Sequence, residues 1–96
     1  VNNMTSLFEG AESFNGELDS WNVSKVINME GMFYQAKSFN KPLDSWNVSN
    51  VTDMRDLFSY AKSFNQPLNS WNVSNVTSMY RMFYRTSIPE EFKPKK

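Results

Sequence analysis

Apolar residues recur along this chain with a spacing of 25 residues, and the three tryptophans mark the repeat most clearly. The phrase "SWNVSNVT" occurs twice without change, at 45–52 and 70–77, and "SWNVSKVI" at 20–27 is a close third copy. Valine, methionine and phenylalanine positions keep the same spacing on both sides of each tryptophan: Trp21, Trp46, Trp71; Val23, Val48, Val73; Met29, Met54, Met79; Phe33, Phe58, Phe83. Self-similarity at a fixed period of this length is the signature of a repeat protein. We therefore predict three tryptophan repeats, with a partial repeat at each end.

Each repeat contains two different spacings of apolar residues. Trp46 and Val48 lie two positions apart, which predicts an extended segment with both side chains on one face. The residues that follow have the spacing of one helix face: Met54, Leu57, Phe58 and Ala61. Thr52 before Asp53 suits the start of such a helix, and "SFNQPL" at 63–68 supplies residues for a return turn. Each unit is therefore predicted to be a short strand, a corner, a short helix and a loop.

A single unit of this size cannot bury enough apolar surface to fold alone, so the units should stack. The predicted fold is an α/β, leucine-rich-repeat-like solenoid of about 25-residue strand-corner-helix coils. We assign 1–86 to the solenoid and 87–96 to a C-terminal cap and tail. Stacking would align the three tryptophans in a buried ladder. It would also align two asparagine rows that can form amide ladders: Asn22, Asn47, Asn72 and Asn15, Asn40, Asn65.

Composition excludes several kinds of chemistry. The chain has no histidine and no cysteine, which removes Cys/His zinc sites, histidine-dependent nucleophilic catalysis and disulfides. Ten basic residues balance ten acidic ones, so there is no net charge to attract nucleic acid or an anionic membrane. No apolar run approaches the roughly 18 residues that span a bilayer. Because the sequence opens on Val1 and its first coil is incomplete, we expect a piece of a longer repeat array.

The acidic residues offer weak candidates for a catalytic or metal site. Asp19 and Asp44 hold equivalent positions, so their carboxylates should lie on neighbouring coils, where they could share a proton or bind a cation. Asn69 continues this row, however, and exposed, solvated carboxylates are the favoured interpretation. We therefore predict no catalytic residue, no metal and no cofactor.

Two surfaces are candidates for binding a partner. One is the polar side of the predicted strands, where the side chains are small and nearly the same in each repeat: Ser20, Asn22, Asp44, Ser45, Asn47, Ser70, Asn72. The other is the outward side of the predicted helices, where the repeats differ most and tyrosines gather: Tyr34, Tyr60, Tyr80, Tyr84. Tyrosine and arginine are enriched at protein interfaces, and Arg85 stands nearby. The sequence does not favour one surface over the other.

The stretch "SFNQPLNSWNVSNVTSMYRMF" at 63–83 resembles the repeat of BspA-like leucine-rich-repeat surface proteins of bacteria, a repeat type often filed as a domain of unknown function. The resemblance covers nearly all of residues 1–86. It implies a leucine-rich-repeat-like fold, a place at the cell surface or in the secreted fraction, and adhesive or protein-binding roles. One departure is that Val51 stands where an ordinary leucine-rich repeat, counted from Leu43, places asparagine.

From these observations we expect a non-enzymatic interaction module, displayed at the cell surface or secreted, that binds an extracellular protein or a glycan. The alternative is a structural spacer or self-assembling stalk without a specific ligand. Self-association through the ends of the solenoid is a further expectation, because open apolar ends favour end-to-end contact.

Overall fold

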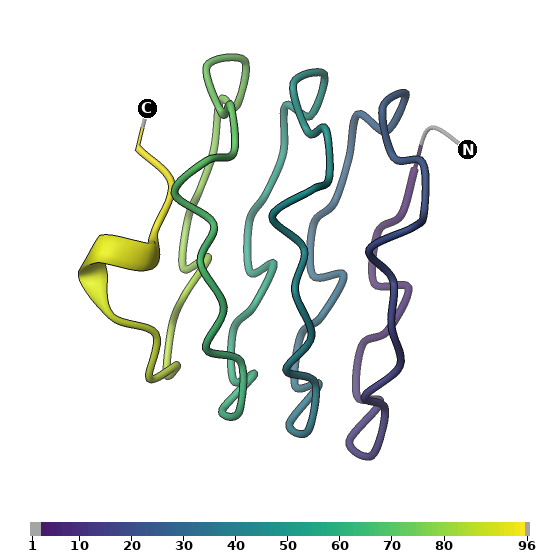
Figure 1. Cartoon of the computed structure of the whole chain (residues 1–96), viewed down its shortest axis with the longest axis vertical. Coiled ribbons are helices and arrows are strands. Elements are labelled where there is room, and N and C mark those ends of the chain that lie inside the picture. Colours follow the sequence, from purple (N-terminus) through teal and green to yellow (C-terminus); the bar gives the residue numbers. More distant parts are fainter. Residues whose placement is uncertain (1–2, 96) are drawn as a thin grey trace.

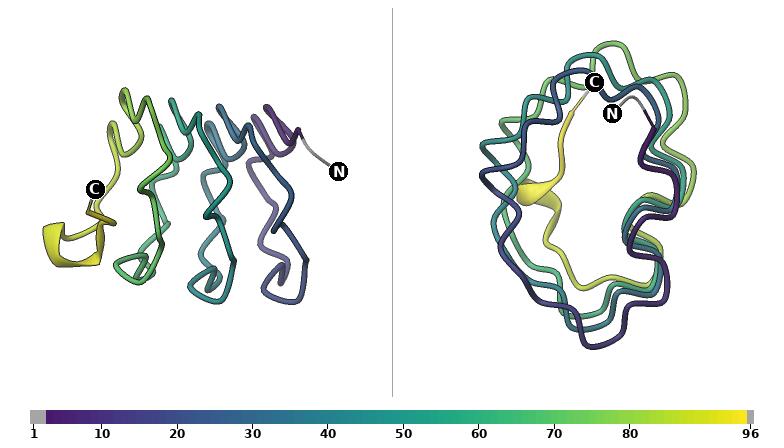
Figure 2. Two further views of the ribbon diagram at one scale, coloured as in Figure 1. Left: turned by 90° about the horizontal axis from the view of Figure 1, so that it is seen from above. Right: turned by 90° about the vertical axis from the view of Figure 1, so that its right-hand side faces the viewer.

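The computed structural model describes residues 3–95, in which the chain winds through successive rounds that lie side by side (Figure 1). Parallel bridges join the same position in each round: Asn3 to Asn28, Asn28 to Asp53, and Asp53 to Ser78. We call each 25-residue round a layer. Seen along the stack, the layers follow nearly the same outline (Figure 2). The predicted repeat therefore sets the spatial period of the molecule.

The predicted α/β class is wrong. Within residues 3–95 the one helix is the short 3-10 helix η1 (Glu90–Phe92), and β pairing is limited to the isolated bridges. The leucine-rich-repeat-like solenoid of strand-corner-helix coils is thus replaced by layers made of turns and irregular segments. No helix in this part of the chain is long and apolar enough to cross a bilayer.

The predicted helix over 54–61 is replaced by consecutive tight turns. The N–H of Leu57 donates to the carbonyl of Met54 at 3.2 Å, and the N–H of Ala61 donates to that of Phe58 at 2.9 Å. The third residue of each turn has a positive φ, 55° at Asp56 and 63° at Tyr60, as type II turns require. The turns still bury the four apolar residues that suggested a helix: Met54, Leu57, Phe58 and Ala61. The same spacing is therefore compatible with both structures.

Alternate N–H groups of this segment bond to the next layer instead of to their own. Three donors take carbonyls 24 positions ahead: Asp56 to Tyr80 at 2.9 Å, Phe58 to Met82 at 2.9 Å, and Tyr60 to Tyr84 at 2.8 Å. In an α-helix each of these groups would donate to a carbonyl four residues earlier. Thr52, the predicted helix start, also bonds between layers, with its N–H on the carbonyl of Ile27 at 2.8 Å. The same N–H groups could thus form either a helix or bonds between layers, and in this structure they bond between layers.

Two columns of positive φ run through the stack at equivalent positions of each layer. One column holds Ser6, Gly31, Asp56 and Arg81, and the other holds Gly10, Gln35, Tyr60 and Arg85. Glycine adopts this region freely, whereas other residues incur a cost of about 1–2 kcal/mol. Gly10 and Gly31 are therefore the residues by which the sequence indicates these turns.

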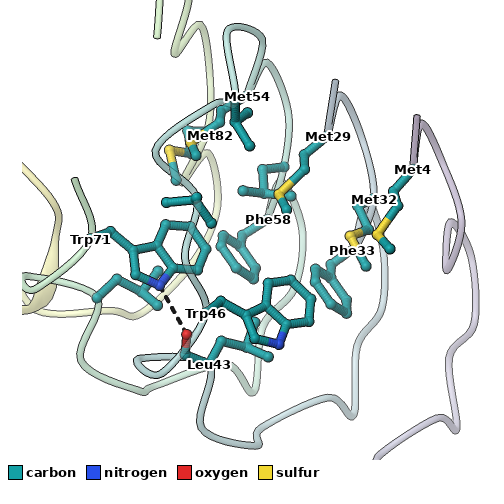
Figure 3. Packing of buried hydrophobic residues seen from close by; sticks show 14 of the residues in the cluster. Met4, Met29, Met32, Phe33, Leu43, Trp46, Met54, Phe58, Trp71 and Met82 are labelled. Atoms are coloured by element: carbon teal, nitrogen blue, oxygen red, sulfur yellow. Dashed lines mark hydrogen bonds between the residues drawn. The ribbon is translucent and has the colours of Figure 1, made fainter. Parts of the chain in front are cut away.

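Columns of aromatic rings fill the core between layers (Figure 3). Phe33 lies 5.3 Å from Phe58 with the two rings 2° from parallel, and Phe39 lies 5.8 Å from Phe64. Within a layer, Phe58 also stacks on Phe64 at 4.3 Å. Such pairs add to the stabilisation from burial of their apolar surface.

The predicted tryptophan ladder forms for two of its three members. Trp46 and Trp71 are both buried, with parallel rings 6.5 Å apart. Each indole N–H donates to a carbonyl of the preceding layer, Trp46 to Leu18 at 2.8 Å and Trp71 to Leu43 at 2.9 Å. Figure 3 shows the second of these bonds. Trp21 is 40% exposed, because it lies in the outermost layer of the described chain. A tryptophan of the ladder is therefore fully buried only where another layer precedes its own.

One of the two predicted asparagine ladders forms. The side-chain oxygen of Asn15 accepts the N–H of Asn40 at 2.8 Å, and that of Asn40 accepts the N–H of Asn65 at 2.9 Å. The other row makes bonds within its own layer and is described below. An unpredicted row replaces it, since the amide of Asn50 donates to the carbonyl of Ser24 at 2.7 Å.

The last described residues lie against the final layer. Ile88 is buried in the core cluster, and Phe92 packs against it. The N–H of Leu68 donates to the carbonyl of Phe92 at 2.8 Å. The segment predicted as a cap thus covers part of the end of the stack, where a further layer would otherwise lie (Figure 2).

Candidate binding surface

The polar surface predicted from Ser20, Asn47 and their equivalents has most of its groups committed to the backbone. The side-chain oxygens of three asparagines accept the N–H two residues ahead, at 3.0–3.1 Å: Asn22 from Ser24, Asn47 from Ser49, and Asn72 from Ser74. These bonds close local turns. The asparagines are exposed, but their acceptor atoms already have a structural role.

The serines of this surface connect neighbouring layers. The hydroxyl of Ser45 donates to the carbonyl of Asp19 at 3.1 Å, and that of Ser70 donates to the carbonyl of Asp44 at 3.4 Å. Ser20, Asp19 and Asp44 are exposed. Residues 3–95 contain no group of three or more acidic side chains placed to hold a metal ion. The serine hydroxyls thus link neighbouring layers along an edge where the side chains of Asp19 and Asp44 are exposed.

The tyrosines of the other predicted surface form a contiguous ladder. Tyr34 packs edge-to-face on Tyr60, with ring centroids 5.7 Å apart, and Tyr60 packs in the same way on Tyr84 at 5.5 Å. Tyr34 and Tyr84 occupy one column of the stack, in which Ser59 stands between them. Tyr60 comes from the adjacent positive-φ column. Its ring thus contacts those of both Tyr34 and Tyr84, in the layer where their own column holds the small residue Ser59.

Ser59 is itself buried and fixed by two bonds. Its hydroxyl bonds to the carboxylate of Asp56 at 2.9 Å and also contacts the carbonyl oxygen of Arg81. Asp56 pairs in turn with the Arg81 guanidinium at 3.2 Å. The serine, the carboxylate and the guanidinium therefore connect two neighbouring layers.

Two guanidinium groups flank the last rung of this ladder. Arg81 lies 5.2 Å from the ring centre of Tyr80 and 5.5 Å from that of Tyr84, and Arg85 lies 5.3 Å from Tyr84. These are cation–π distances. Tyr80 is 64% exposed, the largest exposure among the large apolar side chains of the described chain. We call the following residues the tyrosine–arginine cluster: Tyr34, Tyr60, Tyr80, Arg81, Tyr84 and Arg85.

Charges within the cluster alter its ionisation. A hydrogen bond from Arg85, together with the positive charge of that residue, lowers the pKa of the Tyr84 hydroxyl. The carboxylate of Asp56 raises the pKa of Arg81. The cluster therefore presents an aromatic surface with fixed positive charge at one end.

A shallow hollow of about 160 Å³ lies beside the cluster. Its lining is polar and contains both signs of charge: Ser6, Glu9, Glu30, Gly31, Tyr34, Asp56 and Arg81. Next to it, Arg55 bridges Asp53 at 2.8 Å and Glu30 at 3.4 Å. The sequence missed Arg81 and Asp56 as members of this surface. Asp56 and Arg81 are 25 residues apart and carry opposite charges, and this spacing could have predicted that they lie close together in neighbouring layers.

The sequence matches, over residues 1–93, the family described as Mycoplasma protein of unknown function, DUF285. The chain belongs to this family. No curated protein and no solved structure matches the sequence. The family description assigns no activity, so the function of this DUF285 domain has to be argued from its surface.

Proposed function

We propose that this domain is a non-enzymatic interaction module, displayed at the cell surface or secreted, that binds a protein or glycan partner through the tyrosine–arginine cluster. The observation that carries the proposal is a cluster of partly and fully exposed tyrosines and arginines that contact one another at the surface. Tyr80 is 64% exposed, and Arg81 and Arg85 lie against the neighbouring ring of Tyr84.

The cluster suits binding because its side chains lose little freedom when a partner docks. Tyrosine supplies a large contact area with few rotatable bonds, and the edge-to-face contacts of Tyr34, Tyr60 and Tyr84 restrict those bonds further. Ordering a flexible side chain at an interface costs about 0.5–1.5 kcal/mol. Tyrosine and arginine are also the residue types that dominate interface energetics. The serine and asparagine surface has its acceptors committed to turns, which favours the cluster over it.

A binding screen with two matched variants tests this proposal. The purified domain is applied to a glycan array and to a panel of extracellular proteins, beside Tyr80→Ser with Arg85→Gln and beside Asn72→Ala. We expect a ligand whose binding is lost in the double variant and kept in Asn72→Ala. Binding that is lost only in Asn72→Ala would assign the activity to the other surface. A folded domain that binds nothing would contradict the proposal and favour a structural spacer.

The surface location rests on the resemblance to BspA-like surface proteins, and secretion or display is part of the proposal. We further propose that the domain self-associates through an end of the stack. Leu7 and Trp21, in the outermost described layer, are 50% and 40% exposed, and exposed apolar groups promote association. Light scattering over a range of concentrations tests this, with Trp21→Ser as the control. A strict monomer at high concentration would refute self-association without affecting the binding proposal.

A further inference from the structure

Asn15 differs from every other asparagine of the chain because glycine follows it. Exposed asparagines are common here, but in the phrase "NVSNV" the following residue is valine. Asparagine can lose its amide when the next backbone nitrogen attacks its side-chain carbonyl carbon. A following Cβ hinders this attack, and a branched one hinders it most, whereas glycine has none.

The structure leaves the atoms of this reaction accessible. Asn15 is exposed, and it lies in a segment without helix or strand hydrogen bonds. Among residues 3–95 the N–H of Gly16 has no hydrogen-bond acceptor. A Cβ at position 16 would stand 2.8 Å from the Phe14 ring, too close for an ordinary contact. The packing of Phe14 thus favours the glycine that exposes Asn15 to attack.

The repeats provide two internal comparisons. Asn40 and Asn65 occupy the same row as Asn15, but Lys41 and Gln66 follow them. The side-chain oxygen of Asn40 accepts an N–H of the next layer, as that of Asn15 does, at 2.9 Å and 2.8 Å. Asn65 is exposed like Asn15. The first comparison therefore matches the hydrogen bond, and the second matches the exposure.

We propose that Asn15 is a site of spontaneous deamidation in the folded domain. The nitrogen of Gly16, after loss of its proton, forms a bond to the side-chain carbonyl carbon of Asn15, and ammonia leaves. Water then opens the resulting five-membered imide at either carbonyl, giving aspartate or isoaspartate at position 15. No oxidant, cofactor or second protein takes part in the reaction.

The two products have different effects on the asparagine ladder. An aspartate at position 15 keeps an oxygen where the N–H of Asn40 donates, and its negative charge strengthens that bond. Isoaspartate routes the main chain through the side-chain carbon and lengthens it by one methylene. The bond between layers that joins residues 15 and 40 should then be lost. Deamidation at this position therefore either preserves or loosens the outermost layer, according to which product forms.

Peptide mapping of the aged, folded protein tests the proposal. The domain is incubated in mildly alkaline buffer and digested, and mass spectrometry follows the replacement of amide by acid at residues 15, 40 and 65. An isoaspartate-specific methyltransferase reports the second product. We expect Asn15 to react at least about tenfold faster than Asn40 and Asn65, which corresponds to about 1.4 kcal/mol in activation free energy. Equal rates at the three sites, or no reaction at Asn15, would overturn the proposal.

A variant separates the effect of glycine from that of position. Lys41→Gly creates an Asn-Gly pair in the next layer, and Lys41 makes no hydrogen bond or ion pair within residues 3–95. We expect Asn40 in this variant to react about tenfold faster than in the unchanged protein. An unchanged rate at Asn40 would show that glycine is not the cause. The comparison of the three sites in the unchanged protein does not depend on the folding of this variant.

Discussion

Replacing Trp46 with alanine tests the stacked core most severely. The side chain is 4% exposed, lies parallel to Trp71 at 6.5 Å, and donates its indole N–H to the carbonyl of Leu18 at 2.8 Å. Truncating a buried tryptophan to alanine costs about 3–5 kcal/mol through lost burial and the cavity that remains. A domain of this size is stable by only about 5–15 kcal/mol. Trp46→Ala should therefore remove a large part of the free energy of unfolding or leave the domain unfolded.

Two companion variants turn this into a graded comparison. Trp21 occupies the same repeat position but is 40% exposed and donates no indole hydrogen bond within residues 3–95, so Trp21→Ala should cost only about 1–2 kcal/mol. Trp46→Phe keeps a ring in the core and removes the indole donor, but the Leu18 carbonyl still accepts the N–H of Trp21 at 2.9 Å, so the cost should be only about 0.5–1.5 kcal/mol. Urea titrations followed by near-ultraviolet circular dichroism give the three values. Equal losses for Trp21→Ala and Trp46→Ala would refute the layered arrangement of the tryptophans.

Three further predictions concern the turns and the charged groups. Gly31→Ala should destabilise the domain by about 1 kcal/mol, because φ is 63° there, and a urea midpoint that stays the same or rises would contradict this turn geometry. Arg85→Gln should raise the pKa of Tyr84 towards its ordinary value, which an ultraviolet titration of tyrosinate measures, and a pKa left unchanged would remove Arg85 as its cause. A hydrogen bond from Arg55 and the positive charge of that residue lower the pKa of the Asp53 carboxyl from its ordinary value, so this group stabilises the fold above that ordinary value and loses its contribution as the pH falls through the lowered pKa. Asp53→Asn should accordingly make acid unfolding less dependent on pH, and an unaltered acid transition would show that the ion pair contributes nothing.

The sequence predicts the repeat and most of the core, because burial needs only the right residue at the right spacing. The inward rows of valine, methionine and phenylalanine are buried in the inner layers as the period requires. Secondary structure could not be predicted in the same way. Met54, Leu57, Phe58 and Ala61 lie on one face of a helix, but two successive tight turns bury the same four residues. Deciding between the two requires knowing that alternate N–H groups bond to the next layer, and periodicity within one repeat carries no such information.

For a related reason, the sequence predicted only part of the candidate surface. The tyrosines stood out because they vary between repeats, yet the ladder takes Tyr60 from the adjacent column, in the layer where the column of Tyr34 and Tyr84 holds Ser59. Arg81 belongs to the surface because its guanidinium lies 5.2 Å from the ring centre of Tyr80 and 5.5 Å from that of Tyr84, and its backbone lies in the other positive-φ column. A pattern that assumes helical geometry places neither residue correctly. Gly10 and Gly31, which lie in the two positive-φ columns, were the residues in the sequence that argued against a helix.

Layers bonded to one another, and not helices, position the tyrosine–arginine cluster. The most direct test is a measurement of scalar coupling across the hydrogen bond from the Tyr60 amide nitrogen by nuclear magnetic resonance. The structure places this N–H 2.8 Å from the carbonyl oxygen of Tyr84, in the next layer. We predict a coupling between the Tyr60 nitrogen and the Tyr84 carbonyl carbon. A coupling to the carbonyl carbon of Asp56, four residues earlier, would establish a helix and contradict the layered arrangement.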